Sequence, residues 1–254
     1  MDKKLGYVVS KKNNAVVLLR KYNKLKTILH VKSIAKDTFL RFQSTILLDI
    51  PRTFPQSKWM QDVRNRSKII ELLKVFILQS NIGYIQGMLF IVVPLLKLYE
   101  KQEYLAFWSF IDLTELLRPF YIQLLIPNGP KNGSKQVKKV LDLWQQLRQV
   151  EVETTALDMI EQLLHWKFMT TLYFAITGNN LNNVELLLDY FMEELHNEKK
   201  FMCKICAFAL ALLLSILPNK KIGCEELQML STCYLTSDAL EALLKTSTQC
   251  EFLF

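Results

Sequence analysis

Residues 67–88 read SKIIELLKVFILQSNIGYIQGM, and this stretch combines a long apolar helical pattern with an abrupt break. Its apolar side chains recur every three or four positions, at Ile69, Ile70, Leu72, Leu73, Phe76 and Ile77. With Ser67 as a candidate N-cap, this spacing predicts an amphipathic helix over residues 68–80. Asn81-Ile82-Gly83 ends that helix, and a second apolar helix is predicted over residues 87–99.

The same helical spacing extends along the chain in both directions. Further helices are predicted over residues 38–48, 104–117, 135–149, 155–173, 183–195, 200–217, 224–230 and 237–245. Glycine and proline number only seven each among 254 residues, which is too few for the many turns of an all-β protein. The chain is therefore predicted to be all-α, either a single large multi-helix domain or two helical subdomains separated by the loop at residues 127–134.

The positive charge of the chain is concentrated at its N-terminus. Residues 1–41 contain 11 Lys+Arg and 2 Asp, whereas the other 213 residues contain 21 Lys+Arg and 22 Asp+Glu. We therefore separate a basic N-terminal segment, residues 1–37, from a helical domain over residues 38–254. The segment is interpreted either as a solvated arm or as a surface attracted to anionic lipid or to an acidic partner. It has few aromatic residues and no recognition-helix motif, so nucleic-acid binding is not expected.

The cysteines and the hydrophobic runs indicate a cytoplasmic protein. An odd number of cysteines, five, and the lack of a secretory signal favour free thiols in a reducing compartment. The longest apolar run, residues 205–217, has 13 residues and is too short to cross a bilayer. Cys203 and Cys206 have CxxC spacing without a second matching pair, which favours core packing over a zinc site. Residues 1–41 are also a candidate for peripheral contact with endomembranes.

Residues 46–55, ILLDIPRTFP, place an arginine between two prolines. Pro51 fixes its own φ and disfavours helix at the residue before it, so Arg52 is predicted to lie on stiff, non-helical backbone just past a helix. A guanidinium offers a planar fork of donors that matches phosphate oxygens. A structural ion pair between Arg52 and Asp49 is the alternative interpretation.

Residues 81–88, NIGYIQGM, place a glutamine between two of the seven glycines. Gly83 and Gly87 permit a close approach of the backbone to another group, and Tyr84 is predicted to anchor the turn by its ring. The amide of Gln86 can both donate and accept a hydrogen bond, so it is suited to orienting a water molecule. The alternative interpretation is a turn glutamine that caps the next helix.

Taken together, the two segments resemble the signature of TBC domains, the Rab GTPase-activating proteins. The first motif has the form IxxDxxR and is matched at Ile46, Asp49 and Arg52, with Thr53 continuing the match. The second motif has the form GYxQGM and is matched at Gly83, Tyr84, Gln86 and Gly87. The order of the two motifs and their separation also fit, and the resemblance covers about residues 38–220.

This resemblance implies a protein that completes the active site of another molecule. It implies that Arg52 stabilises charge on the phosphoryl group of GTP in a Rab-type small GTPase, while Gln86 orients the attacking water. GTP and magnesium then belong to the GTP-bound partner, so the chain is expected to be an enzyme regulator with no cofactor or metal of its own. The implied process is vesicle trafficking. A non-catalytic TBC-like scaffold or adaptor that binds a GTPase without accelerating hydrolysis is the alternative.

Overall fold

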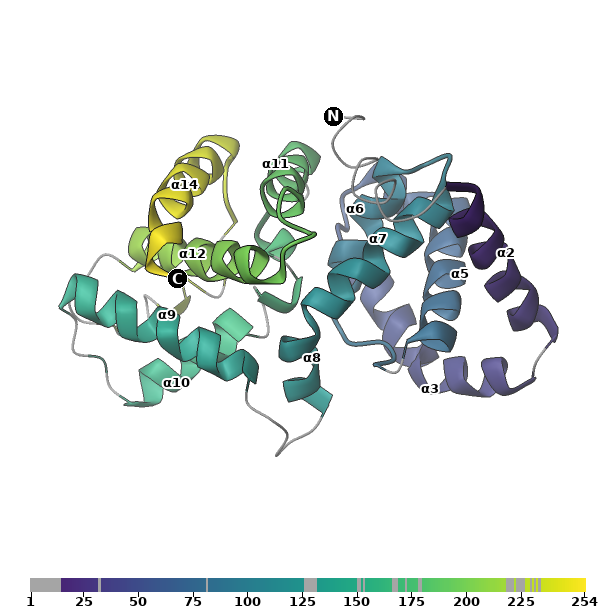
Figure 1. The fold of residues 1–254 in the computed structure, drawn as a ribbon, viewed down its shortest axis with the longest axis horizontal. Helices are drawn as coiled ribbons and strands as arrows, with labels where there is room; N and C mark the ends of the chain where they lie inside the picture. The colour runs from purple at the N-terminus through teal and green to yellow at the C-terminus, as the bar shows by residue number, and fades with distance from the viewer. Residues whose placement is uncertain are drawn as a thin grey trace. The chain divides into compact units, whose positions relative to one another are not determined.

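In the computed structural model, every regular element of the described residues is helical, which confirms the all-α prediction. The structure describes residues 15–31, 33–80, 82–125, 132–149, 152, 154–165, 169–171, 173–177, 180–217, 222, 227–228, 230, 232 and 234–254. The chain divides into two compact units, Met1–Glu115 and Leu116–Phe254, whose helices are drawn in Figure 1. Within the expected loop at residues 127–134, residues 127–131 lie outside the described residues, and the last three residues begin a helix.

The first unit is arranged around one central helix, α5. Its elements are α2 (Ala15–Val31), α3 (Ser33–Asp49), the 3₁₀ turn η1 (Ile50–Arg52), α4 (Lys58–Gln61), α5 (Val63–Gln79), α6 (Leu89–Leu98) and α7 (Glu103–Leu116), which ends at the boundary between the units. The apolar side of α5 is buried, and the helix contacts α2, α3, α4 and α6. The helices predicted over residues 38–48, 68–80, 87–99 and 104–117 are all present, with shifted ends.

The beginning of α5 differs from the prediction. The N-cap is Asp62, whose carboxylate accepts a hydrogen bond from the backbone N–H of Arg64 at 2.8 Å. Ser67 lies inside the helix, where its hydroxyl donates to the Val63 carbonyl at 3.0 Å. The prediction of Ser67 as the cap was therefore wrong, because a serine in a helix interior can bond back to the preceding turn instead of capping.

Helix α2 is an integral part of the first unit. Its residues Leu18 and Tyr22 are buried, and the Tyr22 ring lies 5.0 Å from the ring of Phe107 on α7. The indole N–H of Trp108 donates to the Leu18 carbonyl at 3.1 Å. The interpretation of the basic segment as a solvated arm is therefore wrong for residues 15–31. Residues 1–14 lie outside the described residues.

The second unit has the long apolar helix α12 at its centre. Its elements are α8 (Arg118–Leu125), α9 (Asn132–Arg148), α10 (Thr154–Leu163), the 3₁₀ turns η3 (Met169–Thr171) and η4 (Phe174–Thr177), α11 (Leu181–Met192), α12 (Glu198–Ile216), α14 (Ser237–Cys250) and η5 (Glu251–Leu253). Helix α12 contacts α9, α11 and α14. Its residues 204–213 are all buried, which confirms the interpretation of the apolar run as a core helix.

The cysteines of α12 belong to this core. Cys206 is buried, so core packing is confirmed for this member of the CxxC pair, and burial raises the pKa of its thiol to about 12. Cys203, Cys206 and Cys250 are free thiols. Cys224 and Cys233 lie outside the described residues, as does most of the helix predicted over residues 224–230.

The segment predicted as one helix over residues 155–173 is interrupted. Helix α10 ends at Leu163, and the 3₁₀ turns η3 and η4 follow it. Tyr173 has a φ of +60°, which a right-handed helix does not allow. Its buried hydroxyl donates to the Ile205 carbonyl on α12 at 2.8 Å. A tertiary hydrogen bond thus accompanies a backbone conformation that the apolar spacing did not indicate.

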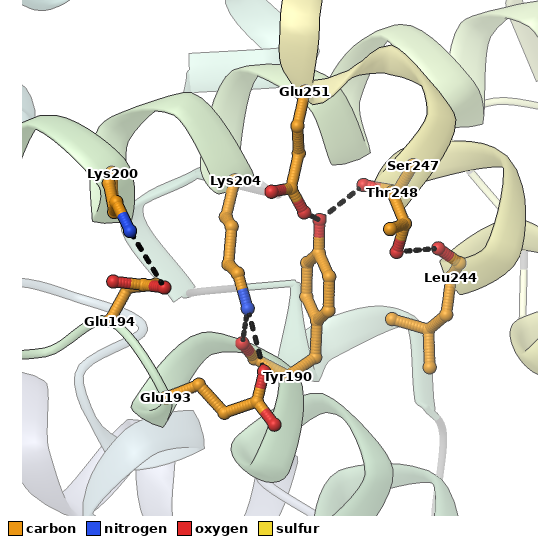
Figure 2. A network of polar contacts seen from close by, with 9 residues as sticks. All are labelled: Tyr190, Glu193, Glu194, Lys200, Lys204, Leu244, Ser247, Thr248 and Glu251. Carbon is orange, nitrogen blue, oxygen red and sulfur yellow. Dashed lines mark hydrogen bonds and ion pairs between the residues drawn. The ribbon is translucent and has the colours of Figure 1, made fainter.

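A polar network joins α11, α12, α14 and η5 within the second unit (Figure 2). The ammonium of the buried Lys204 donates to the Tyr190 carbonyl at 2.8 Å and to a carboxylate oxygen of Glu193 at 3.0 Å. It also lies 4.4 Å from the centre of the Tyr190 ring. The Tyr190 hydroxyl donates to Glu251 at 2.7 Å and shares a hydrogen bond with Ser247, also at 2.7 Å. Tyr190 therefore links three helices and the C-terminal turn.

Replacing Tyr190 by phenylalanine is expected to destabilise the protein by about 1–3 kcal/mol. The variant keeps the ring beside Lys204 but loses the hydroxyl bonds to Ser247 and Glu251. The free energy of unfolding from urea titrations measures the loss. Tyr104→Phe is the control, because the Tyr104 hydroxyl has no hydrogen-bond partner among the described residues. Equal stability of the two variants would show that the network contributes nothing measurable.

Candidate functional site

The first segment of the site is a tight turn that follows α3. The backbone N–H and the hydroxyl of Thr53 both donate to the Asp49 carbonyl, at 3.0 Å and 2.9 Å. These bonds close the chain around η1, in which Pro51 fixes the first turn. Thr53 is buried, whereas the side chain of Arg52 is exposed to solvent. The turn therefore directs Arg52 away from the interior, although Arg52 lies in a 3₁₀ helix and not on the non-helical backbone that was predicted.

The second segment lies between α5 and α6 and depends on its glycines. Gly83 has a φ of +74° and Gly87 a φ of +96°, both in the region that favours glycine. A Cβ at position 83 would lie 2.5 Å from Cζ of Phe42, a residue of α3. The close approach predicted for this glycine is thus confirmed, and the group it approaches is a helix of the same unit. Gln86, between the two glycines, is exposed.

A buried hydrogen bond joins the two segments. The Tyr84 hydroxyl donates to a carboxylate oxygen of Asp49 at 2.6 Å, a length typical of a hydroxyl bonded to a carboxylate. Asp49 is 5% exposed and Tyr84 is 4% exposed. The rings of Phe54 and Phe90 form a second link, with their centres 5.4 Å apart. The backbone that carries Arg52 and the backbone that carries Gln86 are therefore held together by residues of one compact unit.

The two alternative structural roles do not apply. Asp49 bonds to Tyr84, and within the described residues Arg52 has no ion-pair partner, so the Arg52–Asp49 pair of the alternative interpretation is absent. Helix α6 begins after Met88 without a side-chain cap, so Gln86 does not cap it. Both candidate side chains thus project from a buried support into solvent.

Two comparisons with known proteins match this chain. A model of the Rab-GTPase-TBC domain matches residues 17–217. The chain belongs to the Rab-GTPase-TBC domain family. The crystal structure of the Ypt/Rab-GAP domain of Gyp1p resembles it with a TM-score of 0.69 and 16% sequence identity, over 94% of this chain and 81% of that chain. At this identity the likeness shows the fold. A search of curated proteins gives no match.

In the TBC domain the Tyr84–Asp49 hydrogen bond joins the two motifs. Residues outside the motifs also hold the two segments in place. Ile46 is fully buried on α3, one turn before Asp49. Phe42 lies one turn earlier and contacts Gly83. Positions 42, 46 and 49 follow the i, i+4, i+7 spacing of one helix face, so this periodicity was the signal that could have identified Phe42. The Phe54–Phe90 contact had no comparable signal in the sequence.

The described part of this TBC domain has neither a candidate membrane span nor a candidate metal cluster. None of its helices combines the length and hydrophobicity needed to span a bilayer. The same residues contain no group of three or more His, Cys, Asp or Glu side chains arranged for a metal ion. His165 is buried, with Nε2 3.0 Å from the Phe120 carbonyl, and desolvation by burial lowers its pKa.

Replacing Gly83 by alanine is expected to destabilise the TBC domain by about 2–4 kcal/mol. The new Cβ would meet the Phe42 ring, and the φ of +74° would strain an L-residue even without that contact. Urea titrations measure the loss. Adding Phe42→Leu should restore part of the stability, because it relieves the collision but not the backbone strain; Phe42→Leu alone gives the reference. Wild-type stability of Gly83→Ala would contradict the close contact.

Proposed function

We propose that this chain is a GTPase-activating protein for Rab-family small GTPases and that it acts in trans through Arg52 and Gln86. The observation that carries the proposal is the buried Tyr84–Asp49 hydrogen bond beneath two exposed side chains. This arrangement holds an arginine and a glutamine on one unit while leaving the guanidinium and the amide available to a second molecule. Membership of the Rab-GTPase-TBC family supports the choice of partner.

In this mechanism Arg52 enters the nucleotide site of the GTPase. GTP and Mg²⁺ are bound by the partner, and hydrolysis develops negative charge on the oxygens of the transferring phosphoryl group. The guanidinium donates hydrogen bonds to those oxygens in a water-excluded site, where charge stabilisation is strongest. Stiff backbone at Pro51 reduces the flexibility of the segment that must be ordered when Arg52 inserts.

Gln86 supplies the second function, which is to orient the attacking water. Its amide oxygen accepts a hydrogen bond from the water, and its NH₂ group can donate to a phosphate oxygen or to the partner backbone. A correctly oriented water attacks in line with the bond that breaks. No proton needs to be transferred to the glutamine, because its task is positional.

The proposed setting is the cytoplasm, in the regulation of vesicle trafficking, with peripheral contact to endomembranes through residues 1–41. The described part of that segment supports membrane contact. Helix α2 exposes Arg20, Lys21 and Lys24 and contains no acidic residue. Basic side chains near an anionic leaflet each contribute about 1 kcal/mol of attraction.

The test is a single-turnover assay of GTP hydrolysis on a panel of purified Rab GTPases, with and without this protein. Acceleration of at least one member is the expected result. If the protein bound a GTP-loaded Rab but accelerated none of the panel, it would be a scaffold and the proposal would fail. Binding is therefore measured in parallel with hydrolysis.

A further inference from the structure

Helix α3 carries an exposed apolar stripe that leads directly to Arg52. Leu40, Leu47 and Leu48 are 51%, 50% and 58% exposed, although leucine is usually buried. Leu40, Ser44, Leu47 and Pro51 follow one another at intervals of three or four residues, so they lie along one side of the helix and of the turn after it. The opposite side of α3 contacts α5, where Ile46 is buried. The stripe is the outward side of the helix that ends at the arginine.

The charges beside this stripe limit what can cover it. Among residues 39–52, whose side chains the structure describes, the exposed charged side chains are Arg41 and Arg52, and Asp49 is buried. Between Leu40 and Arg52 the exposed surface of α3 and η1 is therefore mainly apolar, with positive charge beside it. A complementary partner presents apolar side chains with acidic groups or phosphate at their edge. A GTPase with bound GTP provides phosphate at the position of Arg52, so one partner can satisfy both features.

We infer that the stripe formed by Leu40, Leu47 and Leu48 is the docking surface for the GTPase that receives Arg52. This inference rests on the proposed function and names the part of the site that binds the partner. Leu47 and Leu48 lie within five residues of Arg52, so a surface that packs on them surrounds the entry of the guanidinium. Apolar contacts around a charged anchor exclude water without supplying most of the binding energy.

The leucines of the stripe and Arg52 should affect different kinetic constants. Burying the exposed part of one leucine is worth about a 5- to 10-fold change in affinity, so the leucines should act mainly on KM. Arg52 should act mainly on kcat, because its interaction strengthens in the transition state. Leu40, which lies farthest from Arg52 along the stripe, should have the smallest effect of the three leucines.

The experiment compares Leu47→Gln/Leu48→Gln with wild type on a Rab GTPase that the wild-type protein stimulates. Glutamine is chosen because it is a good helix former, so α3 should be preserved. The expected result is a 30- to 100-fold fall in kcat/KM, about 2–3 kcal/mol, with kcat changed less than threefold. Leu147→Gln and Met159→Gln are the matched controls, since their side chains are 52% and 51% exposed on α9 and α10. Affinity for the GTPase loaded with a non-hydrolysable GTP analogue is measured for each variant.

The possible outcomes distinguish an error in the docking surface from an error in the proposed function. If wild type stimulates hydrolysis and the double variant has the same kcat/KM and affinity, the docking surface is wrong and the function stands. If wild type stimulates no GTPase but binds one, a weaker affinity of the double variant still supports the surface, and equal affinity overturns it. If wild type forms dimers that the double variant does not form, the stripe is a contact between copies, and the inference is overturned. Failure to bind any GTPase would overturn both.

Discussion

The Arg52→Lys variant is expected to lower the stimulated rate of GTP hydrolysis by about 10³- to 10⁵-fold, which corresponds to about 4–7 kcal/mol of transition-state stabilisation. Lysine keeps the positive charge but replaces the planar fork by a single ammonium. Arg52 is exposed and has no ion-pair partner among the described residues, so its replacement should not disturb the fold. Single-turnover hydrolysis on a responsive Rab measures the rate, and circular dichroism during urea unfolding checks the fold.

The control for this variant is Arg20→Lys, a second exposed arginine of the same unit on α2. It should retain wild-type stimulation. Arg52→Ala should behave like Arg52→Lys, since neither provides the fork. Stimulation by Arg52→Lys within tenfold of wild type would mean that positive charge is sufficient and that the arginine finger mechanism is incorrect.

The second large effect is expected for Gln86→Ala, with a fall of at least about 10²-fold in kcat. The reason is loss of position: without the amide, the attacking water is no longer held in line with the bond that breaks. KM should change little, because one exposed side chain contributes little to ground-state binding. Single-turnover rates over a range of protein concentrations separate kcat from KM.

Gln102→Ala serves as the control, since Gln102 is also exposed in the first unit but lies outside the two motifs. Gln86→Glu gives a further comparison, because it keeps the length and the acceptor oxygen while losing the NH₂ donors. If Gln86→Ala stimulated GTP hydrolysis as strongly as wild type, the water would be positioned by another group, and the GTPase's own residues would be the first candidates.

The helical class and the two motif segments could be predicted from sequence because both depend on local spacing. Apolar residues three and four apart indicated α5 and α12, and the two prolines indicated the turn that carries Arg52. What could not be predicted depends on contacts between residues far apart in the chain. Helix α2 is placed by the bond from Trp108 to Leu18, 90 positions away. A basic stretch with short apolar islands gives no sign of such a partner.

Two other differences have the same physical origin. Ser67 and Asp62 are both good capping residues, and local propensity does not decide which of them begins α5. The conformation of Tyr173 accompanies a hydrogen bond to α12, which is a tertiary contact. At the site, one of the two interpretations of the sequence paired Asp49 with Arg52, three residues away. The observed partner is Tyr84, 35 positions along the chain, and this choice leaves the arginine unpaired among the described residues.

The Tyr84–Asp49 hydrogen bond has a consequence for the entropy of association. Because it joins the two backbone segments within one folded unit, the conformational entropy of bringing them together is lost when the chain folds. Binding of the partner therefore does not have to compensate for this loss of entropy. Under the proposed mechanism, positioning the two groups then adds only the ordering of their side chains, about 0.5–1.5 kcal/mol each, to the general cost of association. A weak and short-lived encounter with a GTPase would suffice to deliver both groups at once.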